Sequence, residues 1–214
     1  MEHKEDLPVD AREKFRGELS RFFESLWPAE EKPLVFGEGQ WHSPDIMLIG
    51  EAPGEQETLQ GRPFVGKAGK NLNGFLDAVG LRREDIYISN VVKVRPVKIS
   101  AKGTVSNRPP NREELALFTP WLLREIMLVQ PQTVVTLGNV ALKALLGQDK
   151  VIGQCHGVET AATVTAPEAK NTLPCSVYPL YHPASIIYNR ALVTTYQEDL
   201  QNLRELLVQR GVVN

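Results

Sequence analysis

The feature that most constrains the fold of this chain is a short apolar run, Ile46–Ile49, which ends in a segment rich in glycine and proline. A run of this length between an aspartate and a glycine is typical of a buried strand in a parallel sheet. In open α/β sheets, ligands bind where such strands end. The loop that follows contains Phe64 between Pro63 and a nearby glycine, and this aromatic ring either fills the core or contacts a ligand.

Three further β-rich runs alternate with helical patterns along the chain. These runs cover residues 86–92, 132–137 and 176–181. Because strands that alternate with helices form a parallel sheet covered on both faces, the sequence predicts an α/β fold. Apolar spacing over residues 9–27 predicts an amphipathic helix, so residues 1–30 are expected to pack as an N-terminal helix on a single domain spanning residues 1–214.

Local signals indicate where one helix begins and bends. Asn111, with Glu114 three residues later, is a helix N-cap signature. Pro120 lies within the same pattern and predicts a kink or a restart of that helix. Residues 151–172 are weakly patterned, and they predict at most an edge hairpin.

Composition places the chain among ordinary globular proteins. Its 214 residues are 42% hydrophobic and 23% charged, which is enough for one full core. The first six residues lack the apolar core of a signal peptide, and no run has the length of a membrane span. Without an export signal, Cys155 and Cys175 are expected to be reduced. The expectation is a cytoplasmic monomer that does not contact a membrane.

Basic residues are distributed unevenly, although the net charge is only −2. Between Ile86 and Arg112 the chain has six lysines and arginines and no acid, and residues 58–76 add three more basic residues without an acid. Local basic runs on a nearly neutral protein suit a polyanionic partner. The alternative interpretation is that both runs are ordinary solvated loops.

Three polar side chains follow three separate predicted strands: Glu51, Asn90 and His182. Because the carboxyl ends of parallel strands meet at one edge of a sheet, these residues are expected to lie together. Taken singly, each is also a common residue of turns and loops. The histidines are isolated and the cysteines lack ligand spacing, so no metal site is expected. The chain also lacks a phosphate-binding loop, a dinucleotide fingerprint and a nucleophile elbow.

Four short motifs occur in order along the chain. They are Gly50-Glu-Ala-Pro-Gly54, Gly61-Arg-Pro-Phe-Val-Gly66, Asn90-Val-Val-Lys93 and His182-Pro-Ala-Ser185. Together they resemble the uracil-DNA glycosylase superfamily, most closely its family 4, from about Val35 to Leu207. The resemblance implies a three-layer α/β/α sandwich with a central four-stranded parallel sheet. It also implies a DNA repair enzyme that removes uracil from DNA by base flipping.

The resemblance gives each pocket residue a task. Phe64 would stack on the extruded uracil, and the side-chain amide of Asn90 would pair with its Watson–Crick edge. His182 would donate a hydrogen bond to the leaving uracil anion, as donors in an oxyanion hole do. Backbone groups of Glu51 and Ala52 would add to that contact, and Glu51 would be the carboxylate nearest the substrate.

Position and charge, rather than the resemblance, add a second carboxylate and several basic residues to the candidate interface. Glu57 is the weaker candidate carboxylate near the substrate. Candidates for contacts with the DNA backbone are Arg62, Lys67, Lys98, Lys102 and Arg108. The turn after His182 would press into the minor groove through Ser185 and Ile186, with residues 187 and 188 as further candidates for the wedge.

The chain departs from the family 4 pattern in three ways. The four cysteines that hold an iron–sulfur cluster in that family are absent, with Val94 and Phe118 at or near two of those positions, so no cofactor is expected. A basic insertion follows Arg95-Pro96 before the family-like pattern resumes at Arg108. In one branch of the superfamily an extended loop carries a histidine that traps DNA covalently, but loop 93–112 has no histidine, so that chemistry is not implied. Ala52 stands where the most active members have an aspartate. Two alternatives therefore stay open: a protein that binds DNA or nucleotides without cleavage, and an enzyme of free nucleotides.

Overall fold

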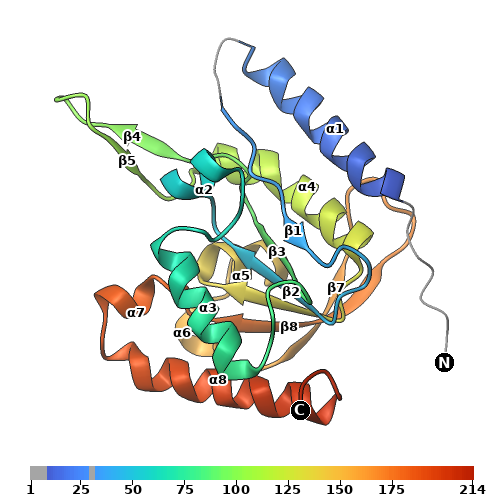
Figure 1. Ribbon diagram of the computed structural model, residues 1–214. Coiled ribbons are helices and arrows are strands. Elements are labelled where there is room, and N and C mark those ends of the chain that lie inside the picture. The colour runs from blue at the N-terminus through green and yellow to red at the C-terminus, as the bar shows by residue number, and fades with distance from the viewer. Residues whose placement is uncertain (1–8, 29–31) are drawn as a thin grey trace.

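The computed structural model describes residues 9–28 and 32–214. At its centre is a six-stranded sheet in the order β1-β3-β2-β6-β8-β7 (Figure 1). The strands of this sheet are β1 (Glu38–Gly39), β2 (Ile46–Gly50), β3 (Tyr87–Asn90), β6 (Thr133–Leu137), β7 (Thr160–Val164) and β8 (Leu173–Leu180). A separate two-stranded hairpin consists of β4 (Val97–Ile99) and β5 (Val105–Asn107).

The four inner strands run parallel, and the two edge strands run antiparallel to their neighbours. The sheet therefore has six strands of mixed direction, which corrects the expectation of a purely parallel sheet of four. β1 is only two residues long and β7 is largely exposed, so neither shows the apolar run by which a buried strand is predicted. β7 lies in the weakly patterned segment 151–172, where it pairs with β8.

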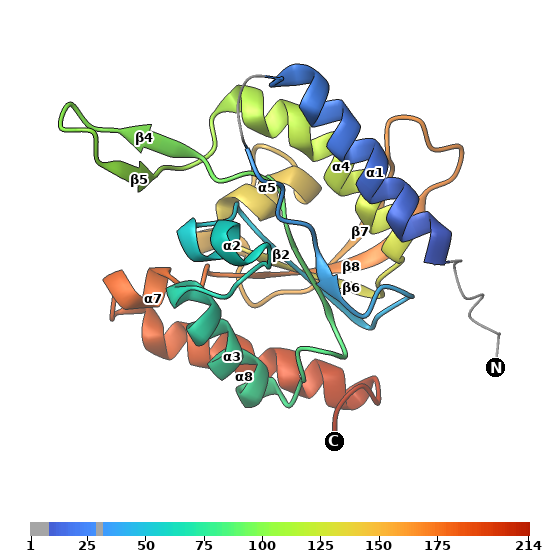
Figure 2. The same cartoon turned by 45° about the horizontal axis from the view of Figure 1, so that its top comes forward.

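Helices cover both faces of this sheet. The helices of the described chain are α1 (Val9–Leu26), α2 (Glu55–Gln60), α3 (Lys67–Val79), α4 (Arg112–Val129), α5 (Asn139–Leu146), α6 (Ile152–Cys155), α7 (Ser185–Tyr188) and α8 (Leu192–Gln209). α1, α4 and α5 lie over one face of the sheet, and α3 and α8 lie over the other (Figure 2). The arrangement is therefore three-layered, with the sheet between two helical layers.

Alternate residues of the inner strands supply two separate apolar cores, because successive side chains of a strand point to opposite faces. In β2, Met47 and Ile49 pack in the core shared with α1 and α4, and Ile46 and Leu48 pack in the core shared with α3 and α8. All four side chains are buried. The run Ile46–Ile49 is apolar throughout because a helical layer covers each face.

Helix α4 begins where the sequence predicted and continues past its proline. Asn111 Oδ1 accepts from the Glu114 backbone N–H at 2.8 Å, and Glu114 Oε2 accepts from the Asn111 backbone N–H at 2.8 Å, which confirms the predicted cap. The expected restart at Pro120 is wrong, because one helix spans Arg112–Val129. Phe118 and Leu122 on either side of the proline are fully buried, so packing holds the helix together there.

The N-terminal helix α1 packs on the same core as α4. It buries Phe15, Leu19 and Phe23, whereas Leu26, which also has helical spacing, is 42% exposed. The remainder of the expected N-terminal segment, residues 1–8 and 29–30, falls outside the described residues. No helix in the described part of the chain is both long enough and apolar enough to cross a membrane.

Candidate active site

Three of the predicted site residues meet at the carboxyl edge of the sheet. Gly50, the last residue of β2, is the Cα partner of Asn90 at the end of β3. A Cβ built on Gly50 would lie 2.4 Å from Asn90 Oδ1 and 2.4 Å from Phe64 Cζ, so both side chains lie directly over this glycine. The rings of Phe64 and His182 are 6.0 Å apart and inclined by 28°. The structure therefore brings an amide, an aromatic ring and an imidazole together.

Asn90 holds a hydrogen-bond acceptor that has no partner. The residue is only 3% exposed, and no described residue donates to its Oδ1. Leaving a buried polar atom unpaired costs about 1–3 kcal/mol, so such an atom is normally satisfied by water or by a ligand. A ligand with an N–H group at this position would satisfy the atom.

His182 is arranged as a neutral hydrogen-bond donor. Its Nδ1 lies 3.2 Å from the backbone N–H of Ala184 and accepts from it. Because that nitrogen is an acceptor, the imidazole proton is on Nε2. Burial lowers the pKa of His182 from 6.5 to about 4, so the ring carries no charge near neutral pH.

Phe64 has an uncommon backbone conformation that neighbouring residues stabilise. Its φ is +53°, in the left-handed region that residues other than glycine seldom adopt. Arg83 Nη1 donates to the Phe64 carbonyl at 3.1 Å, and Arg83 Nη2 donates to the Pro63 carbonyl. The same guanidinium forms an ion pair with Glu38 at 2.7 Å. The ring is 5% exposed, and it packs in the core shared with α3 and α8 as well as over Gly50 beside the unpaired acceptor of Asn90. Its expected role in stacking on a base stays a prediction.

The same loop is fixed at both ends by Glu57, and the expected contact of this carboxylate with the substrate stays a prediction. Its Oε1 accepts from the backbone N–H groups of Val65 at 3.0 Å and Gly66 at 2.7 Å. Its Oε2 accepts from the backbone N–H of Gly54 at 3.1 Å. Both oxygens are therefore engaged with the backbone, and Glu57 positions the loop that carries Phe64.

Glu51 and Ala52 follow β2 directly. The Glu51 carboxylate has no hydrogen-bond partner among the described residues, and burial raises its pKa above the ordinary value. The carbonyls of Gly50 and Glu51 accept from the backbone N–H groups of Val91 and Val92, which joins this turn to the segment after β3. Ala52 is partly buried against the core of α1 and α4.

Beneath Asn90 lies a buried ion pair between Lys93, the last residue of the motif that begins at Asn90, and Glu125, which no motif includes. Lys93 and Glu125 are both 0% exposed, and Lys93 Nζ lies 2.7 Å from Glu125 Oε2. Lys93 Nζ also donates to Ser89 Oγ at 2.7 Å and to the backbone carbonyl of Asn90 at 2.5 Å. The hydroxyls of Tyr87 and Ser89 donate to the two carboxylate oxygens of Glu125. The network fixes the end of β3 from below.

The basic residues expected at DNA separate into two groups. Arg108 donates to Glu114 through both terminal nitrogens at 2.7 Å and to the Val97 carbonyl through Nε, so it joins the hairpin to α4 and is not available as a free phosphate ligand. Arg62 forms an ion pair with Glu38 at 2.7 Å but stays largely exposed. Exposed lysines make up the second group: Lys67, Lys98 and Lys102.

The turn after His182 is tied to the body of the protein. Ser185 N–H donates to the His182 carbonyl at 2.7 Å, and the Asn71 side chain donates to the Pro183 carbonyl at 3.0 Å. Ile186 is half-buried against the core of α3 and α8, so its expected wedge role stays a prediction. The side chains of residues 187 and 188 fall outside the described structure.

Comparison with known proteins identifies the family. The model of the uracil DNA glycosylase superfamily matches residues 36–206. The chain is 34% identical to the type-4 uracil-DNA glycosylase of Sulfurisphaera tokodaii, over 94% of this chain and 86% of that protein. This chain belongs to the uracil-DNA glycosylase superfamily. It is also 36% identical to the type-4 uracil-DNA glycosylase of Pyrobaculum aerophilum, over 79% of this chain and 81% of that protein.

A solved structure agrees with this family at the level of the fold. The crystal structure of Pedobacter heparinus SMUG2 matches with a TM-score of 0.52 and 15% identity, over 98% of this chain and 93% of that chain. Identity this low shows the fold alone. The type-4 relatives support the resemblance to family 4 that the four motifs indicated.

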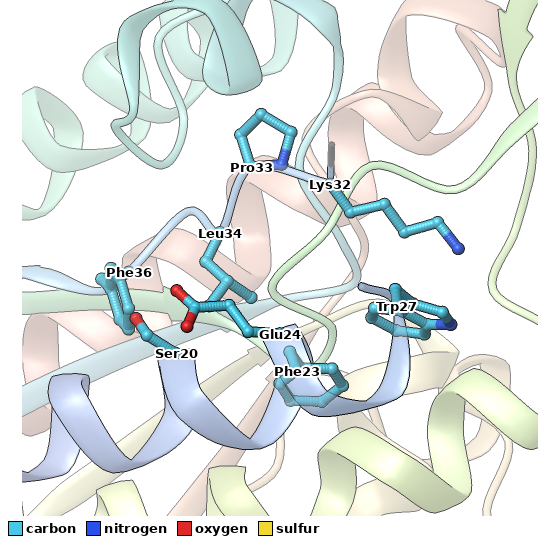
Figure 3. A pocket seen from close by; sticks show the side chains of 8 residues that line it. All are labelled: Ser20, Phe23, Glu24, Trp27, Lys32, Pro33, Leu34 and Phe36. Atoms are coloured by element: carbon cyan, nitrogen blue, oxygen red, sulfur yellow. The ribbon is translucent and has the colours of Figure 1, made fainter. Parts of the chain in front are cut away.

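The residues of this superfamily member do not fit the iron–sulfur cluster of family 4. Val94 and Phe118 are buried in the apolar core, and the Phe118 ring stacks on Phe23 at 4.1 Å. Phe23 in turn stacks on Trp27 at 5.0 Å. Figure 3 shows the hollow between α1 and residues 32–36, with Phe23 and Trp27 on its α1 side. A row of aromatic rings supplies no thiolate ligand for iron.

We therefore expect the purified protein to be colourless and free of iron. Each thiolate of a cluster must come from a cysteine, and the two cysteines of this chain lie elsewhere, Cys155 in α6 and Cys175 in β8. Elemental analysis and the visible absorption spectrum test this expectation. Iron in stoichiometric amount, with absorption from thiolate-to-iron charge transfer, would contradict it.

Breaking the buried ion pair is expected to destabilise the protein strongly. Lys93→Met leaves Glu125 charged and unpaired in the core, and we expect the free energy of unfolding to fall by about 3–5 kcal/mol. The double variant Lys93→Met/Glu125→Leu removes both charges and is expected to regain most of that loss. Urea unfolding measures the free energy of unfolding of the parent and of both variants. Arg82→Met, which breaks the exposed pair with Asp85, is the control, and its free energy of unfolding should stay close to that of the parent. A Lys93 variant as stable as the parent would refute the ion pair.

The lowered pKa of His182 is expected to make stability depend on pH. Between pH 6.5 and about 4 the unfolded chain binds a proton at this ring that the folded chain does not. The contribution of the ring to stability is therefore complete above pH 6.5 and is lost as the pH falls towards 4. Urea unfolding at several pH values measures the free energy of unfolding as a function of pH. In this range that free energy should change less with pH in His182→Gln than in the parent. An NMR titration in which His182 takes up its proton near pH 6.5 would refute the assignment.

Proposed function

We propose that this protein is a DNA repair glycosylase that hydrolyses the bond between uracil and deoxyribose after the base has left the DNA stack. The observation that carries the proposal is the buried, unpartnered Oδ1 of Asn90, which lies over Gly50 together with the Phe64 ring. The neutral imidazole of His182 stands beside that ring. Relatives that are named type-4 uracil-DNA glycosylases support the same activity.

Recognition of the base follows from two side chains. The Phe64 ring offers an aromatic face on which a flat base stacks. Asn90 offers an acceptor for the N3–H of uracil and an amide N–H for its O4, so one side chain satisfies both groups. The Lys93–Glu125 ion pair beneath Asn90 holds this residue in place through its backbone carbonyl.

Cleavage requires stabilisation of the departing base and of the sugar. When the bond between C1′ and N1 breaks, its electron pair stays on uracil and negative charge develops at O2. His182 Nε2–H is the donor that we assign to this oxygen. Water then adds to the cationic C1′ carbon, and the proton that it loses passes through solvent and neutralises the uracil anion. Glu51, partly buried with a raised pKa, is our candidate for stabilising the cation and orienting the water, because Ala52 has no polar side chain.

Contacts to the DNA backbone are assigned to the exposed lysines Lys67, Lys98 and Lys102, with Ser185 beside the pocket. We further propose that the protein acts as a single-domain monomer in the cytoplasm.

A second candidate function is recognition of DNA without cleavage. Ala52 favours that alternative, because the position lacks the acid found in the most active members of the family.

Replacing either polar pocket residue is expected to impair cleavage much more than binding. His182→Ala and Asn90→Ala each remove one preorganised group, and we expect the rate of uracil excision to fall by about 100–1,000-fold. Single-turnover kinetics at saturating enzyme on a labelled oligonucleotide with one uracil separate the chemical step from binding. Asn73→Ala, at an exposed position of α3, is the control and should cleave at the parental rate.

Two outcomes would contradict the proposal in different ways. If both variants excise uracil as fast as the parent, the pocket assigned here is wrong. If the parent binds uracil-containing DNA but excises nothing, the second candidate function is the correct one.

A further inference from the structure

The β4–β5 hairpin carries two large apolar side chains that face water. Ile99 and Val105 are Cα partners across the hairpin, and they are 69% and 48% exposed. The hairpin extends away from the sheet and its helices beside α2 (Figures 1 and 2). An exposed apolar pair on a projecting strand edge favours association with another molecule, so proteins seldom keep one without a partner.

Strand alternation shows which way this pair faces. Val97 and Asn107 are also cross-strand partners, and they share a face of the hairpin with Ile99 and Val105, which lie two residues further out. Asn107 lies beside Gly54, the last residue of the turn that follows β2, because a Cβ built on Gly54 would be 3.2 Å from Asn107 Nδ2. The apolar pair therefore shares the face of the hairpin that is turned towards this segment, about 7 Å further along the strand.

Two ion pairs hold the base of the hairpin in this position. Arg95 donates through Nε to Asn107 Oδ1 at 2.7 Å and lies 3.3 Å from Glu55 of α2. Arg108 follows β5 at the same base and joins it to Glu114 of α4. Because the start of one strand and the end of the other are both anchored, the base of the hairpin has a defined place beside α2 and α4.

Charge decides which kind of partner suits this surface. Lys98 lies on the opposite face of the hairpin, Lys102 lies in its turn, and no acid occurs between residues 86 and 112. Apolar side chains flanked by cations suit a molecule with flat apolar faces and a polyanionic backbone, which describes nucleic acid.

We propose that Ile99 and Val105 pack against the nucleobases next to the extruded uracil in double-stranded DNA. This inference rests on the proposed function for the position of the uracil. Extruding a base from a duplex exposes the faces of its neighbours to water, and apolar side chains that cover those faces offset part of the loss of stacking. A single strand has no continuous stack to repair, so the hairpin favours duplex substrates.

The test compares two substrates and two matched double variants. Ile99→Ser/Val105→Ser removes the apolar pair, and Val158→Ser/Val208→Ser removes apolar side chains of similar exposure, 60% and 43%, elsewhere on the surface. We expect single-turnover excision at subsaturating enzyme to fall about tenfold on duplex DNA and less than about twofold on single-stranded DNA for the hairpin variant. The control variant should match the parent on both substrates.

A second readout does not depend on cleavage. The probe is a duplex with 2′-fluoro-2′-deoxyuridine, whose glycosidic bond resists hydrolysis, next to the fluorescent base 2-aminopurine. The parent is expected to raise the fluorescence of 2-aminopurine on binding, because extrusion of the uracil removes the base stacked on it. The hairpin variant should raise this fluorescence much less. If the parent excises nothing and yet raises the fluorescence through the hairpin, the proposed function fails and this inference stands.

Two results would overturn the inference. Equal losses on duplex and single-stranded DNA would show that the pair acts on the fold or on general affinity. If the hairpin variant matches the parent in excision on both substrates and in fluorescence with the duplex probe, the hairpin does not contact nucleobases. An acidic protein partner would then be the better occupant of this surface.

Discussion

A lysine and a glutamate without access to water join the central sheet to helix α4 directly beneath Asn90. Burying two charges is unfavourable unless they pair and their remaining groups are hydrogen-bonded. Here Tyr87, Ser89 and the Asn90 carbonyl complete the network, so the end of β3 has one favourable arrangement. The position of the side chain assigned to base recognition therefore depends on core packing as well as on its own strand.

The loop that carries Phe64 depends on Glu57 and Arg83, which hold its backbone in place. Glu57 binds three backbone N–H groups of the loop around Phe64, and Arg83 binds the Pro63 and Phe64 carbonyls. These contacts stabilise a backbone conformation that a phenylalanine rarely adopts. Fixing the ring before a ligand arrives reduces the ordering that binding would otherwise require. The end of β3 and the loop around Phe64 are therefore each held in place by contacts within the fold.

Charged residues show how little a sequence pattern says about the partners of a charge within the fold. Glu57 and Arg108 were expected at the substrate and the DNA, and Lys93 was counted with the loop bases, but all three form contacts within the fold. A motif reports that a charge is present and not what it faces. In the case of Lys93 the local signals were its place at the end of a motif and within the apolar run Val91–Val94, and neither names Glu125 as its partner. No local sequence pattern predicts that the Phe118 ring stacks on Phe23, because the two residues are 95 positions apart in the chain.

The sequence by itself determined the alternation of strands and helices, the α4 cap, and the arrival of Asn90 and His182 at the carboxyl edge of the sheet. These features depend on short-range periodicity and on the direction of parallel strands, which local sequence records. Tertiary structure alone decided that Asn90 Oδ1 stays unpaired, that His182 is neutral, and that edge strands β1 and β7 complete a mixed sheet. Burial and hydrogen-bond partners arise from residues distant in the chain, so no local pattern specifies them.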